Sequence, residues 1–373
     1  MTNRERAMNI LHFKPADRMP AVHFGYWNEL LYEWAEQGHI SEDLARGWRD
    51  GNDADYEIDK LIGWDFNWSN KVQGIDLKIN PLFEEKVLEV LPDGCRRMQT
   101  KYGVIERLKP GVTSIPSEDD YLLKDRQAFE TLFKPKMQFS PDRIDFEALK
   151  KQNETRRKDI PVSLRVGSVM GDIRDLTTVM GMSYLMYDED EELFADIVDT
   201  YADMQYKTVE AVLEAGALVD FAHFWEDICF KNGPLMSPAL FDELCAKHYK
   251  KRTDLCKKYG IDIVSLDCDG VTEALLPTWV NNGVNTMFLI EVGVWGDQFE
   301  KARNKFGNKV LGVGGMNKIA LREDKAAVDK EIERMERIAK LGGFIPCPDH
   351  RLMPGTKFEL VQYYAEKIKE IKF

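Results

Sequence analysis

The sequence lacks both a long apolar segment and an excess of positive charge. No run among its 373 residues approaches the roughly 18 apolar residues that a membrane-spanning helix needs. Lys and Arg number 51 against 64 Asp and Glu, which gives a net charge of −13. Because nucleic-acid binding and attachment to acidic membranes both need clustered positive charge, we expect neither partner.

Signals for secretion and for paired cysteines are absent as well. The six cysteines are scattered, without a Cys-x-x-Cys pair, and the polar start at residues 1–6 carries no apolar signal core. Reduced thiols are typical of a reducing compartment, so we expect a cytoplasmic protein. With 8 Trp, 13 Tyr and 19 Phe the chain is also expected to fold rather than to be disordered.

Short apolar runs alternate with helical patterns along most of the chain. Several runs are apolar without alternation, as strands buried on both faces are. Residues 191–215, 237–258 and 326–341 have apolar side chains at helical spacing. Eight strands that alternate with helices predict an α/β (β/α)8 barrel, a TIM barrel. The eight runs are 21–25, 63–68, 162–166, 218–224, 261–266, 286–291, 309–312 and 344–347.

Two regions of the sequence lie outside the eight predicted strand–helix repeats. Thr2 and Glu5 have the spacing of a capping box, which predicts an N-terminal helix. Residues 72–160 fit a barrel repeat least well, because 87–90 and 95–108 flank a Pro-Asp-Gly turn typical of a β-hairpin. Residues 126–153 follow as a helical excursion. We therefore predict a single barrel domain over residues 1–373, with 72–160 inserted as a cap beside the barrel mouth.

Polar side chains follow several of the predicted strands. Active sites of such barrels lie at the C-terminal ends of the strands, so these side chains should converge on one rim. Carboxylates and a histidine in one place suit a divalent metal or a general acid–base pair. The candidates at the strand ends are Trp225, Glu226, Asp267, Asp269, Glu291 and His350.

Some of these strand-end side chains could have a structural role instead of a functional one. A carboxylate after a strand often caps the next helix, and Asp269 fits either interpretation equally. Trp225 is typical of packing, whereas a histidine at a strand end, such as His350, is poorly explained as core.

Two further features could contact a substrate. His23, Tyr26 and Trp27 could line an aromatic substrate pocket, although such clusters are more often core. Arg165 lies inside an apolar strand, so it needs a carboxylate or a substrate as partner.

At these residues the chain resembles the uroporphyrinogen decarboxylase superfamily over nearly its whole length. Residues 4–20 are similar to the N-terminal helix and Arg-x-Pro of the family. Residues 350–356 resemble the His-Gly-Ile-Leu-Pro-Gly-Thr ending of true decarboxylases. Residues 225–238 are similar to a segment of the methyltransferase-like branch. The resemblance implies a (β/α)8 barrel, in a family that often dimerises, and it leaves the oligomeric state open.

The departures from the family decide between its branches. True decarboxylases carry Arg-Gln-Ala-Gly-Arg-Tyr after the Arg-x-Pro, with arginines that hold the porphyrinogen carboxylates. The corresponding residues 22–29 contain no arginine and end in Glu29. The comparison therefore argues against decarboxylation of uroporphyrinogen and points to the corrinoid-dependent methyltransferases.

The thiol-specific methyltransferases of this superfamily bind zinc through His-x-Cys and a later Cys. Alignment on the following glycine places Asp267 and Asp269 on that His-x-Cys, and His350 on the last Cys. A register shifted by one residue would instead use Cys268 with Cys347. Oxygen ligands are harder than thiolates, but they would still hold zinc and leave it more electrophilic toward an ether oxygen.

The resemblance thus implies a methyltransferase that acts with zinc and with a corrinoid on a separate partner protein, because the chain has no Asp-x-His-x-x-Gly motif. The methyl donor would be a small methylated molecule, with an aryl methyl ether as the best guess. The departing phenolate would be stabilised by the metal or protonated by His350 or Glu226. Two alternatives remain: a decarboxylase of a small substrate, and a non-catalytic subunit of a corrinoid system.

Overall fold

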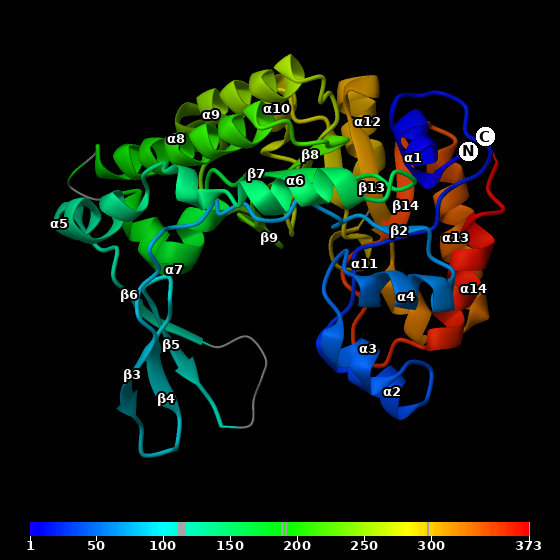
Figure 1. Ribbon diagram of the computed structural model, residues 1–373, viewed down its shortest axis with the longest axis horizontal. Helices are drawn as coiled ribbons and strands as arrows, with labels where there is room; N and C mark the ends of the chain where they lie inside the picture. Colours follow the sequence, from blue (N-terminus) through cyan, green and yellow to red (C-terminus); the bar gives the residue numbers. More distant parts are fainter. Residues whose placement is uncertain (111–116, 188–189, 191, 297, 373) are drawn as a thin grey trace.

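A computed structural model describes residues 1–110, 117–187, 190, 192–296 and 298–372 (Figure 1). Eight short parallel strands form its centre, and each falls within or overlaps one of the eight predicted runs. They are β1 (Val22–His23), β2 (Phe66–Asn67), β7 (Ser163–Gly167), β8 (Phe221–Trp225), β11 (Val264–Asp267), β12 (Thr286–Leu289), β13 (Leu311–Met316) and β14 (Phe344–Pro348).

These strands close into a barrel. Six of them form one parallel sheet in the order β14-β13-β12-β11-β8-β7, and β1 pairs with β2 in parallel. Parallel bridges join the two sheets at both edges, one between Lys71 and Ser163 and the other between Tyr26 and Leu352. The predicted (β/α)8 barrel is therefore confirmed.

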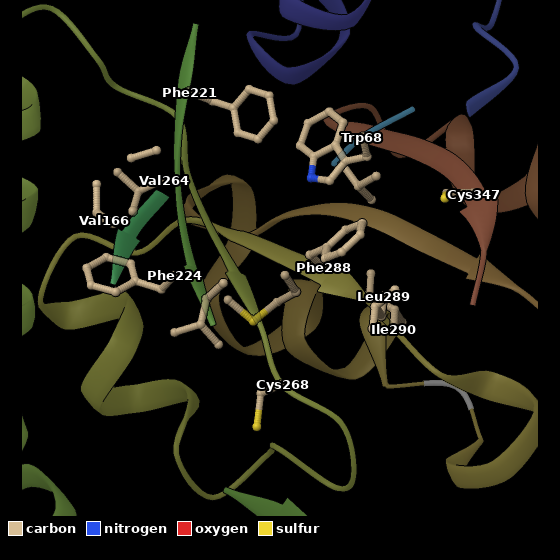
Figure 2. Close-up of a cluster of buried hydrophobic side chains, with 14 of the residues drawn as sticks. Trp68, Val166, Phe221, Phe224, Val264, Cys268, Phe288, Leu289, Ile290 and Cys347 are labelled. Atoms are coloured by element: carbon tan, nitrogen blue, oxygen red, sulfur yellow. The ribbon is translucent and has the colours of Figure 1, made fainter. Parts of the chain in front are cut away.

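Aromatic and aliphatic side chains pack together in a buried cluster at the barrel strands (Figure 2). Trp68 stacks on Phe221 at 4.2 Å between ring centroids, and Phe288 lies 6.1 Å from Trp68. Strands β11, β12, β13 and β14 are buried along their whole length. This burial on both faces explains why their sequences show no polar alternation.

Helices cover the outside of the barrel (Figure 1). The three long helices predicted from spacing correspond to α8, α9 and α13, and Thr2 and Glu5 form the predicted capping box of α1. No helix in the described ranges is both long and apolar enough to span a bilayer. The helices are α1 (Asn3–Leu11), α2 (Asn28–Glu36), α3 (Glu42–Gly47), α4 (Asp53–Ile62), α5 (Arg126–Ala128), α6 (Phe146–Thr155), α7 (Gly171–Leu185), α8 (Leu193–Glu214), α9 (Pro238–Lys258), α10 (Leu276–Asn281), α11 (Val292–Trp295), α12 (Phe299–Phe306), α13 (Lys325–Ala339) and α14 (Phe358–Ile368).

The inserted region is more elaborate than the predicted hairpin. It forms a four-stranded antiparallel sheet of β3 (Lys86–Val90), β4 (Arg96–Gln99), β5 (Val104–Leu108) and β6 (Ser117–Tyr121), which projects from the barrel beside α7 (Figure 1). The predicted continuous strand over 95–108 is interrupted at a turn, because Gly103 adopts a φ of 83° and its amide bonds to the Thr100 carbonyl. The helical excursion begins with α5 and a π-helical turn and ends in α6.

Candidate active site

A cavity of about 470 Å³ lies at the C-terminal ends of the barrel strands. Side chains from β7, β8, β11 and the segment after β14 line it, and the inserted region contributes Lys78 and Tyr102. This is the rim at which barrels of this kind place their chemistry. A volume of this size suits a small organic ligand.

Three aspartates meet on one side of this cavity, and we call Asp227, Asp267 and Asp269 the acidic cluster. Each offers a carboxylate oxygen, and these oxygens lie within 4.8 Å of one another. Asp267 ends β11, while Asp227 follows β8 on the neighbouring strand. The amide of Asp269 donates a hydrogen bond to Oδ1 of Asp227 at 3.1 Å, which holds the two loops together.

The electrostatics of the acidic cluster show a shortage of positive charge. Burial and the neighbouring carboxylates raise the pKa of Asp267 well above its ordinary value, and they raise that of Asp269 to about 7. Burial also raises the pKa of Asp227. Oδ1 of Asp269 is buried and finds no hydrogen-bond partner among the described residues. Such a group of carboxylates is stabilised by a bound cation or by shared protons.

His350 lies next to the acidic cluster. Its Nε2 is 3.7 Å from Oδ2 of Asp269, and its ring meets the edge of Phe24 at 6.0 Å. Burial, followed by the charges of Lys318 and Arg351, lowers the pKa of His350 to about 4. The imidazole is therefore neutral at neutral pH, so one nitrogen is free to accept a proton or bind a metal and the other to donate a hydrogen bond.

The geometry favours the aspartate register over the cysteine register. Cys347 is fully buried in β14 and does not line the cavity, whereas Cys268 lines a neighbouring cavity of about 30 Å³. Figure 2 shows the two thiols well apart. No group with metal-holding geometry in the described part of the chain contains a cysteine.

Glu226, which we predicted as a proton donor, lies outside the cavity. Its side chain is fully buried and accepts five hydrogen bonds. These come from the hydroxyls of Ser168 and Tyr249 and from the amides of Val169, Met170 and Gly171. The carboxylate therefore holds the turn between β7 and α7 and is committed to that role.

Three further residues that the sequence predicts to contact the substrate, Arg165, Trp225 and Glu291, lie in two different cavities. Arg165 and Trp225 line the cavity, with the Arg165 guanidinium 5.9 Å from the Trp225 ring. Glu291 lines the smaller neighbouring cavity instead.

The N-terminal aromatic residues that we predicted as a substrate pocket do not line this cavity. His23 and Tyr26 are buried in the core and Trp27 is 40% exposed at the surface. The aromatic surface of the cavity comes from Phe24 and Trp68, together with Trp225 and Tyr102.

His23 instead belongs to a buried charged pair. Its Nδ1 accepts a hydrogen bond from the Gly25 amide, and its Nε2 lies 2.8 Å from Oδ1 of Asp59. Burial is the largest single influence and disfavours the charged imidazole, but the charge and hydrogen bond of Asp59 together with the charges of Asp55 and Asp50 outweigh it, and the pKa of His23 is raised.

This raised pKa predicts a pH-dependent contribution to stability. A histidine with a raised pKa stabilises the fold below its ordinary pKa of 6.5, and the stabilisation is lost as the pH rises through the folded-state pKa. The variant His23→Gln should therefore lose more unfolding free energy at pH 6 than at pH 9, as measured by urea denaturation. His39→Gln serves as control, because His39 is exposed and forms no ion pair with a described residue. An equal loss at both pH values would show that the pair is uncharged.

Sequence reasoning missed Asp227 and Lys71 as site residues. Asp227 has a φ of 42°, a left-handed conformation that non-glycine residues adopt rarely. The signal available in the sequence was a third carboxylate at a strand end. Lys71 lies beyond the short β2, and its position in the cavity depends on the bridge to Ser163.

Comparison with solved structures places the chain among barrel proteins. A methyltransferase from Methanosarcina mazei shares 16% identity over 99% of both chains, with a TM-score of 0.58. A B12-independent methionine synthase from Shewanella sp. W3-18-1 shares 12% identity over 95% of this chain and 98% of its own, with a TM-score of 0.48. At 16% identity the similarity to the methyltransferase concerns the fold alone.

No curated protein matches the sequence significantly. Residues 123–371, well over half of the chain, match the family described as Uroporphyrinogen decarboxylase (URO-D). That region contains six of the eight barrel strands, the acidic cluster and His350. The chain therefore belongs to the uroporphyrinogen decarboxylase family.

Proposed function

We propose that this protein is a corrinoid-dependent methyltransferase, which moves a methyl group from a small methylated substrate to the corrinoid of a separate carrier protein. An aryl methyl ether is the substrate class we favour. The observation that carries the proposal is the acidic cluster beside the neutral His350 in a 470 Å³ cavity. The barrel shared with a methyltransferase supports it.

The donor atoms at the barrel mouth fit a divalent cation. Three carboxylates and an adjacent neutral imidazole are ligands that zinc accepts, and the unpartnered Oδ1 of Asp269 faces the same cluster. The second group with metal-holding geometry is His23, Asp55 and Asp59. It fits less well, because Asp55 already accepts hydrogen bonds from Trp48, Gly51 and Asn67.

The chemistry supplied from outside the chain has two parts: zinc provides Lewis acidity toward the ether oxygen, and the carrier's corrinoid provides the nucleophile for the methyl group. The chain's own residues bind and orient the ether. Phe24, Trp68 and Trp225 offer faces against which an aromatic ring can pack. As the carbon–oxygen bond breaks, its electron pair stays on the oxygen, and His350 can donate a hydrogen bond to the phenolate that forms.

The experiment is methyl transfer to cob(I)alamin from methoxybenzene and from methoxybenzenes that carry a polar or charged ring substituent, followed by the absorbance of methylcobalamin. We expect methylcobalamin and phenol in equal amounts. If the zinc-loaded protein forms neither, the proposal is wrong. Release of carbon dioxide from a small aromatic acid without any corrinoid would establish the decarboxylase alternative instead.

His350→Ala should lower the rate of methyl transfer by about 100-fold, because the departing oxygen loses its hydrogen-bond donor. The exposed His39→Ala should leave the rate unchanged. The measurement is the initial rate of methylcobalamin formation at saturating substrate. If His350→Ala is as active as the wild-type protein, a direct role for the imidazole is ruled out.

A further inference from the structure

The same cavity contains two positive charges, on Lys71 and Arg165, that no carboxylate in the described part of the chain meets at ion-pair distance, and we call them the cationic pair. Lys71 forms a β-bridge with Ser163, and Arg165 lies two residues further along β7 on the same side of the strand. Both side chains line the cavity. Within the described residues neither side chain makes a hydrogen bond or an ion pair, and the Arg165 guanidinium lies over the ring of Trp225 at 5.9 Å from its centroid.

Other cations of the cavity do have carboxylate partners. Lys78 pairs with Asp172, and Arg351 donates to Asp50 at 2.7 Å. Asp50 also accepts a hydrogen bond from Asn67, so it is engaged on both sides. The cationic pair thus differs from its neighbours, which are neutralised within the protein.

Positive charges lie close together around the cationic pair, while the carboxylates of Asp50 and Asp267 act on it from beyond ion-pair distance. Burial, followed by the charges of Arg165 and Lys71, lowers the pKa of His223 to about 3. Burial also lowers the pKa of Lys71, and Arg165 adds to this effect while Asp50 opposes it. A negative group that entered here would relieve this repulsion.

We infer that Lys71 and Arg165 bind a carboxylate group of the substrate. This inference rests on the proposed function and names the substrate class: an aromatic acid that carries a methyl ether. A neutral substrate would leave two partly desolvated cations unpaired, which is costly. The planar fork of arginine matches the two oxygens of a carboxylate.

The distance between the cationic pair and the acidic cluster supports an aromatic acid as the substrate. Arg165 is level with His223 in the strand register, and His223 is level with Ser265 on β11. Asp267 follows two residues later along β11, roughly 7 Å nearer the barrel mouth. This offset is comparable to the separation of two para substituents on a benzene ring. A carboxylate at the cationic pair therefore places an ether oxygen near the acidic cluster.

The test is calorimetric titration of the purified protein, without corrinoid, with 4-methoxybenzoate and with the neutral 4-methoxybenzamide of the same shape. We expect the benzoate to bind at least about tenfold more tightly than the amide. Lys71→Met and Arg165→Met should each weaken benzoate binding about tenfold and leave amide binding unchanged. Arg165→Lys, which keeps the charge without the fork, should fall between Arg165→Met and the wild type.

The matched control is Lys151→Met, which removes an exposed lysine from α6 and should change neither affinity. Thermal unfolding of each variant checks the fold, and removal of an unpaired charge should not lower the Tm. Equal affinity for both ligands, no binding of either, or unchanged benzoate binding by both variants would overturn the inference.

The titration also separates this inference from the proposed function. Benzoate binding that depends on the cationic pair, in a protein that forms no methylcobalamin, would support the carboxylate subsite and contradict the methyltransferase. Methyl transfer from methoxybenzene, in a protein that binds the benzoate and the benzamide equally, would support the methyltransferase and contradict the carboxylate subsite.

Discussion

Replacing Asp269 by asparagine should leave the protein unable to hold a divalent cation. The residue is central to the acidic cluster, since it contacts Asp227 through its amide and His350 through its carboxylate. The variant Asp269→Asn removes one charged ligand and keeps the shape of the side chain. We expect bound zinc to fall from about one ion per chain to nearly none, and the rate of methyl transfer to fall by at least about 100-fold.

The measurement is metal content by mass spectrometry after dialysis against zinc, together with the initial rate. Asp175→Asn is the matched control, because Asp175 lines the same cavity but pairs with Arg174 and Lys78 outside the acidic cluster. Its metal content should match that of the wild-type protein. A full complement of zinc in Asp269→Asn would show that the cluster is not the metal site.

Replacing Glu226 by alanine should destabilise the protein by about 3–5 kcal/mol, because each buried donor left without a partner costs about 1–3 kcal/mol. The carboxylate satisfies three backbone amides between Val169 and Gly171, and these would be left buried without partners. The change is measured as the free energy of unfolding in urea.

Tyr249→Phe provides the graded comparison for Glu226→Ala. It removes a single hydrogen bond to the same carboxylate and should cost about 1–3 kcal/mol. A Glu226→Ala variant as stable as the wild-type protein, but without methyl transfer, would restore the catalytic role that the strand-end position predicted.

The barrel could be predicted because its strands are buried on both faces. A continuous apolar run such as 344–347 has few other interpretations between two helices, so the sequence located each strand. The inserted region could not be predicted in the same detail. Its strands are mostly exposed, and the turn at Gly103 is one glycine within an otherwise continuous pattern.

The strand-end rule located part of the site for a physical reason. Parallel strands bring their C-terminal ends together, so Asp267, Asp269 and His350 had to lie on one rim. The same rule could not separate Asp227 from Glu226. These neighbours follow one strand, and their different roles depend on the amides of residues 169–171, which only the folded chain brings to Glu226.

The most direct test of metal-assisted methyl transfer at the barrel mouth is a chelation experiment on the wild-type protein. The rate of methylcobalamin formation from an aryl methyl ether and cob(I)alamin is measured after treatment with EDTA, and again during titration with zinc. We predict loss of activity on chelation and full recovery at about one zinc ion per chain. Methyl transfer that persists in the metal-free protein, or that zinc does not restore, would contradict the account.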